Sequence, residues 1–141
     1  MLETEPQIIE QYIRPGKVKL VYRHLQQMGP GSQLLSEASE CVADQGRFWE
    51  MRRAIYARYT QLYDNTRAQA EAAAAEVGAD VAALGACLDA GTHAAAVQAD
   101  YAAATAEGVR SRPVFTVGDR TIVGAQPFAV FKELLDRTLG G

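Results

Sequence analysis

The sequence has few cysteines, and their positions exclude two common uses of this residue. Cys41 and Cys87 are the only cysteines among 141 residues. They lie too far apart for a redox Cys-x-x-Cys pair and are too few for a structural zinc site. The sequence holds two histidines, His24 and His93, and nothing in their spacing from the cysteines suggests a metal site. We therefore expect no metal ion and no other cofactor.

An excess of positive charge and a long apolar run are also missing. The formal net charge is −3, which gives no electrostatic reason to expect binding to nucleic acid or to an anionic membrane surface. The apolar runs are far too short to span a bilayer, so no membrane insertion is expected. No signal peptide is visible, because Met1 is followed closely by the acidic residues Glu3 and Glu5. For the chain as it is written, these features predict a cytoplasmic location.

The remaining composition is that of a globular domain with a substantial core. Hydrophobic residues make up 48% and charged residues 22% of the chain. Apolar residues at helical spacing over 8–13 predict a first helix, which the Pro15-Gly16 pair ends. Residues 17–23 are β-branched and apolar in the middle, which predicts a strand. From Ser32 to about residue 109, glycines separate several short predicted helices.

The pattern changes to short strands near the end of the chain. Residues 113–117 and 121–123 are predicted strands, and the Gly118-Asp119 turn between them predicts a β-hairpin. Pro127 then suits the first position of a closing helix. The predicted order is helix, strand, helical block, hairpin and helix, which indicates an α/β fold.

Segments from both ends and from the middle of the chain carry a family resemblance. The residues are GKVKLVYR at 16–23, QGRFWE at 45–50, CLDAG at 87–91, PVFTVG at 113–118 and GAQPF at 124–128. Together and in this order they resemble the DsbA-like family of bacterial thiol–disulfide oxidoreductases. The resemblance implies an α/β fold with a thioredoxin-like core, formed by residues 1–30 and 108–141, and an inserted all-helical domain at residues 31–107. It also implies a protein or peptide substrate.

The catalytic segment of that family is missing from this sequence. In the family a Cys-x-x-Cys pair follows the first core strand, and here the resemblance begins inside the helix that carries it. We therefore expect a chain truncated at its N-terminus, with Met1 downstream of that pair, a core without its first strand, and no catalytic residue. An export signal further upstream would place the parent outside the cytoplasm, as in the family. Two alternatives are a non-catalytic peptide-binding or assembly module of the same fold, and a distant glutathione-using isomerase or transferase relative.

The resemblance also points to particular site residues. Pro113 resembles the family's cis-proline, which helps to hold an extended substrate peptide, although a strand-opening proline is an alternative. Arg112 stands where the family has threonine or a small residue, so Arg112 and Pro113 are the expected substrate-binding residues. Some relatives carry a structural disulfide in the insertion, and Cys41 and Cys87 are candidates for one. Reduced, buried cysteines or a catalytic role are the alternatives.

Three further side chains have expected positions. His24 is expected to be a partly exposed loop histidine, and Phe48 and Trp49 are expected in the core.

Without the central strand, residues 17–23 and 113–117 would expose unpaired backbone groups. We expect a homodimer that buries these edges, with closure of the two strands within one chain as the alternative.

Overall fold

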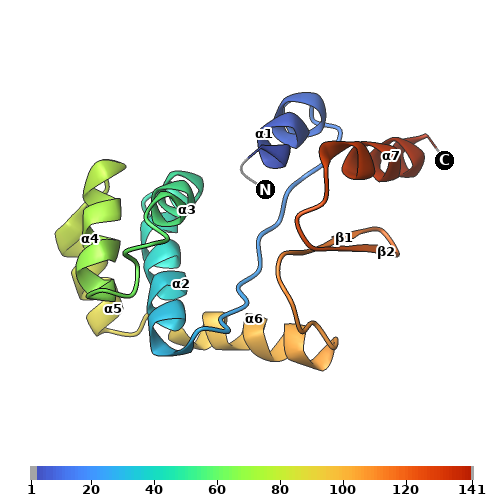
Figure 1. Cartoon of the computed structure of the whole chain (residues 1–141). Coiled ribbons are helices and arrows are strands. Elements are labelled where there is room, and N and C mark those ends of the chain that lie inside the picture. The colour runs from blue at the N-terminus through green and yellow to red at the C-terminus, as the bar shows by residue number, and fades with distance from the viewer. Residues whose placement is uncertain (1–2, 141) are drawn as a thin grey trace. The chain divides into compact units, whose positions relative to one another are not determined.

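The structure, a computed structural model, describes residues 3–140. Met1, Leu2 and Gly141 lie outside the described residues. The expected core ranges begin at Met1 and end at Gly141, so these two limits are not described. Figure 1 shows the elements along the chain. Their bounds are α1 Thr4–Ile8, η1 Ile9–Ile13 (a π-helix that continues α1), α2 Gly29–Ala43, α3 Phe48–Ala57, α4 Thr66–Glu76, α5 Val81–Asp89, α6 Ala94–Ala106, β1 Val114–Val117, β2 Arg120–Val123 and α7 Phe128–Leu139. No helix among the described residues combines the length and the apolar character needed to cross a membrane.

The described chain forms two compact units. The terminal unit comprises residues 3–23 and 105–140, and the helical unit comprises residues 24–104. The helical unit therefore interrupts the terminal unit in sequence, whereas the resemblance places the insertion at residues 31–107.

The terminal unit is built on the β-hairpin. β1 and β2 pair antiparallel, with Phe115 opposite Ile122 and Val117 opposite Arg120. α7 contributes Phe131 to the core, and the rings of Phe115 and Phe131 meet edge to face with centroids 4.9 Å apart. Such pairs are favourable because the positive ring edge meets the negative ring face. The buried residues of this core are Tyr12, Ile122, Phe131 and Leu135.

The predicted strand at residues 17–23 is wrong, because the described residues hold a sheet of two strands and neither pairs with this segment. Its start is tied instead to the preceding helix, since the backbone N–H groups of Lys17 and Val18 both donate to the carbonyl oxygen of Tyr12. Val18 packs against the core of the terminal unit, whereas Val21 is 63% exposed. A strand requires a hydrogen-bonded partner, and this segment instead follows the core of the terminal unit only at its start, through Val18.

The helical unit has a separate core formed by α2, α3, α4 and α5. Met51, Leu84 and Val42 are its largest fully buried side chains. α2 begins at Gly29, three residues before the Ser32 expected to cap it, because Pro30 fits the first turn of a helix. α5 begins as expected from its sequence: the Asp80 carboxylate accepts hydrogen bonds from the N–H groups of Ala82 and Ala83.

Candidate functional site

Arg112 and Pro113, the expected substrate-binding residues, lie together where the chain enters β1. The peptide bond between them is cis. Arg112 is exposed and Pro113 is half-buried. The Pro113 carbonyl oxygen accepts a hydrogen bond of 2.8 Å from the N–H of Gly124, so the hairpin holds this proline directly.

The ladder of the hairpin shows which backbone groups of β1 are directed away from β2. Because Pro113 and Gly124 form a hydrogen-bonded pair, the next pair, Val114 with Val123, is non-hydrogen-bonded. Thr116 with Thr121 is the following pair of this kind. The N–H and C=O groups of Val114 and Thr116 therefore point to the outer edge of β1. Among residues 3–140 no third strand pairs with this edge.

No cysteine thiol accompanies Pro113 within the described residues of the terminal unit. Both cysteines lie in the helical unit, and the sequence contains no others. The terminal unit as described therefore offers a backbone edge and a cis-proline but no thiol.

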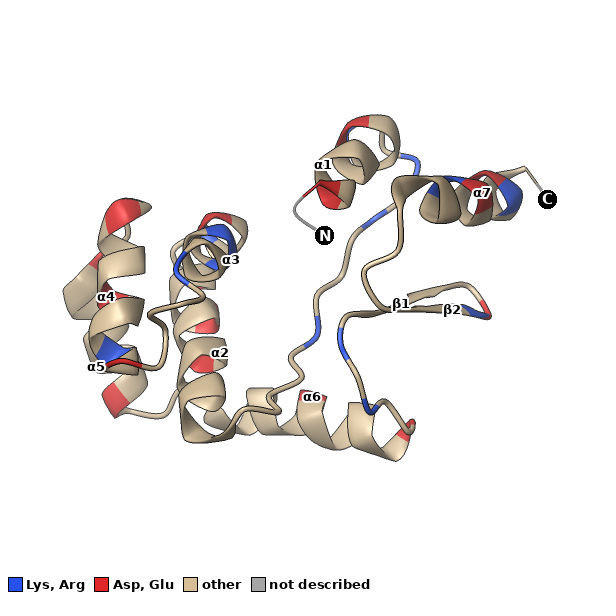
Figure 2. Cartoon of the chain, in the orientation of Figure 1, with Lys and Arg blue, Asp and Glu red and all other residues tan. Residues whose placement is uncertain are grey.

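A small charged cluster joins η1 to α7 within the terminal unit. The Tyr12 hydroxyl donates a 2.6 Å hydrogen bond to Asp136, and Lys132 pairs with the same carboxylate. The bonds from Lys132 and Tyr12 lower the pKa of Asp136, while the bond to Asp136, followed by burial, raises the pKa of Tyr12. Acidic and basic residues are interspersed along α7 (Figure 2), as expected for a helix with a solvated face.

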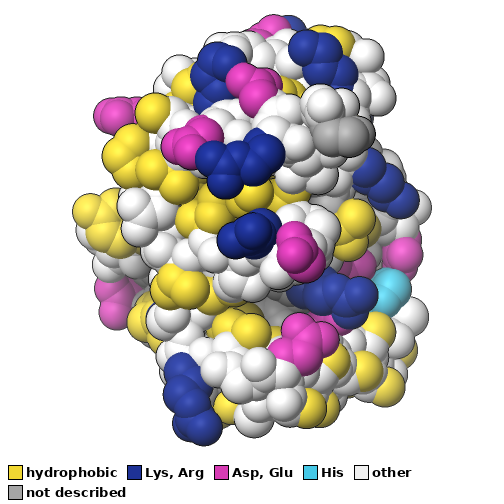
Figure 3. Space-filling view, turned by 90° about the vertical axis from the view of Figure 1, so that its right-hand side faces the viewer, with side chains coloured by type: hydrophobic (Ala, Val, Ile, Leu, Met, Phe, Trp, Pro, Cys, Tyr) yellow, Lys and Arg dark blue, Asp and Glu magenta, His cyan; other side chains and the backbone are white. Residues whose placement is uncertain are grey.

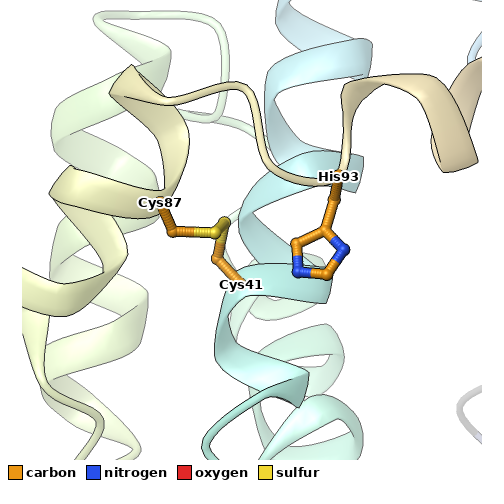
Figure 4. A group of neighbouring side chains, drawn as sticks. All are labelled: Cys41, Cys87 and His93. Atoms are coloured by element: carbon orange, nitrogen blue, oxygen red, sulfur yellow. A yellow bond between two sulfur atoms is a disulfide. The ribbon is translucent and has the colours of Figure 1, made fainter.

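In the helical unit, Cys41 and Cys87 form a disulfide that joins α2 to α5. Their Cα atoms are 5.9 Å apart, within the range that a disulfide can bridge. Figure 4 shows the His93 ring beside this bond. The two Sγ atoms and a ring nitrogen of His93 lie within 4.8 Å of one another. Asp44 holds the ring through a 2.7 Å contact between its carboxylate and His93 Nε2.

Two expectations for the helical unit are wrong. His24 is 5% exposed rather than lying open in a loop, because its Nε2 lies 2.7 Å from a Glu40 carboxylate oxygen and its backbone N–H donates to Asp100. Trp49 is 37% exposed rather than buried in the core. At the start of α3, Trp49 meets the ring of Phe48 edge to face instead of packing into the centre of the unit. Burial of a polar ring is tolerated when its hydrogen-bonding groups have partners, as for His24.

A polar hollow of about 300 Å³ lies beside α6 in the helical unit. Gln26 is 9% exposed, and its side-chain N–H donates to the carbonyl oxygen of Val97, whereas its Oε1 has no hydrogen-bond partner. The lining residues are mainly amides: Gln26, Gln27, Gly29, Gln33, Gln98 and Tyr101. The hollow contains no charged group or thiol, so it offers hydrogen bonding but no evident catalytic chemistry.

The order of the elements fits one class of protein. An α/β chain whose hairpin and closing helix are separated in sequence from its first helix by a disulfide-bonded helical unit is consistent with a thioredoxin-like fold that carries an insertion. A family model described as thioredoxin matches residues 1–137. The chain therefore belongs to the thioredoxin family.

Two longer proteins are also similar to this chain. One is a protein named Na(+)/H(+) antiporter NhaA from Herminiimonas arsenicoxydans, 31% identical over 124 residues that make up 88% of this chain. The other is named Na(+)/H(+) antiporter NhaA 3, from Salinispora tropica, and is 36% identical over 43% of this chain. The chain spans 19% of the first protein's length and 10% of the second's.

Sequence reasoning missed the His93–Asp44 pair beside the disulfide. A partial signal is present, because Asp44 follows Cys41 by three residues and so lies on the same face of α2 or just beyond it. His93 follows Cys87 across the turn between α5 and α6, where Gly91 has a positive φ of 60°. The backbone N–H of Thr92 donates to the carbonyl oxygen of Cys87, which closes this turn. The direction of that turn is not evident from residue spacing.

Proposed function

We propose that this chain is a DsbA-type domain of the protein thiol–disulfide oxidoreductase lineage, with protein or peptide substrates. The observation that carries the proposal is the insertion of a helical unit, residues 24–104, into a chain of the thioredoxin family. The sequence segments that resemble the DsbA-like family lie in both units. The cis-proline position at Pro113 belongs to the same pattern.

The chain as it stands does not perform the dithiol exchange of that lineage. The reaction needs a thiolate, which is stabilised at a helix N-terminus. Cys41 lies near the C-terminal end of α2, and Cys87 lies in the last turn of α5. Both are held in one disulfide, and there is no free cysteine in the described residues. The negative end of a helix dipole disfavours a thiolate, so neither cysteine is an activated nucleophile.

An insulin-reduction assay tests this loss of activity. We expect the chain to precipitate insulin with dithiothreitol no faster than a Cys41→Ser, Cys87→Ser double variant does. Turnover well above that control would show that these cysteines are catalytic after all.

A grafted catalytic segment tests the lineage itself. A family-type first strand with a Cys-x-x-Cys turn, joined ahead of Glu3, is expected to restore oxidation of a reduced peptide. A Ser-x-x-Ser graft is the matched control. A folded Cys-x-x-Cys graft with no more turnover than the serine graft would argue for the alternative of a non-catalytic peptide-binding or assembly module.

The disulfide also supports a location for the domain. Structural disulfides persist in oxidising compartments and are rare in the cytoplasm of most cells. The Cys41–Cys87 bond therefore supports an extracytoplasmic location for the domain, which agrees with the location expected from the resemblance to the DsbA-like family. Trapping of free thiols with a maleimide in intact source cells would test this: we expect no labelling before reduction, and labelling of both cysteines would contradict it.

A second candidate function rests on the two antiporter relatives. Since 88% of this chain matches 19% of a protein named as a Na⁺/H⁺ antiporter, we propose that the domain serves as an accessory domain of such a transporter. An antibody against the helical unit should then detect a membrane-bound polypeptide several times larger than 15.2 kDa in the source cells. A band near 15 kDa that is absent from membranes would exclude this role.

A further inference from the structure

The disulfide, His93 and Asp44 form a cluster that the proposed function does not use. We propose that reduction of the Cys41–Cys87 bond converts this cluster into a binding site for a thiolate-seeking divalent cation of the Zn²⁺ class. The oxidised chain would not bind the ion there, so the site is controlled by redox state. The inference is independent of the oxidoreductase lineage.

The donor atoms suit such an ion. Two thiolates and an imidazole are the preferred ligands of Zn²⁺, and such ligand sets occur in many protein sites. The two Sγ atoms and a His93 ring nitrogen already lie within 4.8 Å of one another. Figure 4 shows the histidine approaching the sulfurs from the turn between α5 and α6, so three segments of the helical unit converge there.

The distances require only small movements. With Zn–S bonds of about 2.3 Å at tetrahedral angles, the two sulfurs would stand about 3.8 Å apart and a sulfur and the histidine nitrogen about 3.5 Å apart. The sulfurs must therefore separate from bonding distance, which side-chain rotation can achieve while the Cα atoms stay near their present 5.9 Å. The His93 nitrogen, now within 4.8 Å of the sulfurs, must approach by roughly 1.3 Å at most.

Asp44 strengthens the site. A metal-bound histidine usually has a carboxylate partner that orients its ring, and loss of such a partner weakens metal binding. The Asp44 carboxylate is already 2.7 Å from His93 Nε2. Its side chain is 57% exposed and that of His93 is 20% exposed, so the cluster is open to an entering ion on that side.

The chemistry balances with a named reductant. A dithiol reductant breaks the Sγ–Sγ bond, passing two electrons and two protons to Cys41 and Cys87 while it is oxidised to a disulfide. When Zn²⁺ binds, each cysteine thiol loses its proton to solvent as its sulfur–metal bond forms. The second step changes no oxidation state.

Co²⁺ is the probe, because its thiolate complexes absorb light and Zn²⁺ displaces it. The chain is reduced with a phosphine, freed of reductant and titrated with Co²⁺ under argon. We expect thiolate-to-cobalt charge-transfer absorption that saturates at one ion per chain and disappears on addition of Zn²⁺. The oxidised chain should show none. The absence of this absorption in the reduced, folded chain would overturn the proposal.

Variants distinguish metal binding at this three-ligand site from metal binding by the two cysteine thiols alone. His93→Ala should weaken Co²⁺ binding at least tenfold, and Asp44→Asn should weaken it about 10- to 100-fold. His24→Gln changes the other histidine of the same unit and should leave binding unchanged. Circular dichroism of each reduced variant confirms that it is folded. Equal affinity of the wild type and a folded His93→Ala variant would show that the thiols bind metal without this site.

Discussion

At the residue scale, the Cys41–Cys87 disulfide is the strongest single constraint in the helical unit. It closes a loop with a sequence separation of 46 residues. In the chain-entropy description, closing a loop of this length removes about 4 kcal/mol of conformational freedom from the unfolded chain. Cys41 is buried and Cys87 half-buried against the common core of α2, α4 and α5, so the bond also fixes packed elements.

Replacing both cysteines should therefore destabilise the helical unit. We expect the Cys41→Ala, Cys87→Ala variant to lose about 2 to 4 kcal/mol in its free energy of unfolding, measured by urea titration. Addition of dithiothreitol should destabilise the wild type by a similar amount and leave the double variant unchanged. A reductant effect on the double variant would indicate a different cause.

A second residue-scale prediction concerns Asp136 and pH. Lys132 and Tyr12 lower the pKa of Asp136, so the folded state favours the ionised carboxylate more than the unfolded state does. Such a group stabilises the fold above its unfolded pKa of about 4, and the stabilisation is lost as the pH falls through the depressed folded pKa. Asp136→Asn should therefore lower Tm near neutrality and flatten the decline of Tm below about pH 4.

The matched control for this pH dependence is Asp119→Asn. Asp119 lies in the hairpin turn with its side chain 91% exposed, so its loss should leave the acid limb of the Tm curve as in the wild type. Thermal melts followed by circular dichroism at several pH values give the comparison. An unaltered acid limb in Asp136→Asn would show that other carboxylates control acid unfolding.

At the element scale, α5 shows how a short apolar helix is held in place. It has nine residues, too few for stability in isolation, and depends on its cap and its packing. Asp80 closes its N-terminus, and the Gln45 side chain in turn exchanges hydrogen bonds with the Asp80 backbone. Leu84 is completely buried against the other helices of the unit.

Truncation of Leu84 should accordingly be costly. Leu84→Ala is expected to lower the free energy of unfolding by about 2 to 5 kcal/mol, because it removes apolar contacts and leaves a cavity. Ala86→Gly, at an exposed interior position of the same helix, should cost only about 1 kcal/mol through helix propensity. Similar losses in the two variants would mean that α5 contributes to the fold through its backbone rather than its core face.

At the scale of the whole molecule, the outer edge of β1 is a strand edge that no other strand within residues 3–140 covers. We propose that a second copy of the chain pairs there, forming a homodimer. An unpaired strand edge readily accepts another strand, and Val114 and Thr116 direct their backbone groups to it. Figure 3 shows acidic, basic and hydrophobic side chains interspersed with one another.

Proline substitutions test this homodimer. Thr116→Pro removes an N–H from the outer edge of β1 and should abolish dimers seen by sedimentation velocity at micromolar concentration. Thr121→Pro removes an N–H from the opposite edge of the hairpin, because Thr121 faces Thr116 in the same non-hydrogen-bonded pair, and should leave the dimer intact. A monomeric wild type, or equal effects of the two prolines, would contradict pairing through β1.

What the sequence by itself determined is the local structure and the thioredoxin-like class. Glycine and proline positions and apolar periodicity are local signals, so they predicted the hairpin and the division of the helical block. The α/β thioredoxin-like class followed from the resemblance, and the family match over residues 1–137 confirms it. The DsbA-type activity, the substrate residues Arg112 and Pro113, and the homodimer stay predictions.

Only the tertiary structure decided which distant residues meet. Residues 17–23 have strand-forming side chains, but within residues 3–140 no strand pairs with them, because pairing depends on a partner rather than on propensity. His24 is buried because Glu40 and Asp100, far along the chain, satisfy its polar groups. His93 reaches the Cys41–Cys87 bond because the turn after α5 reverses the chain and α2 packs against α5. Each outcome depends on long-range packing, which residue spacing along one chain does not encode directly.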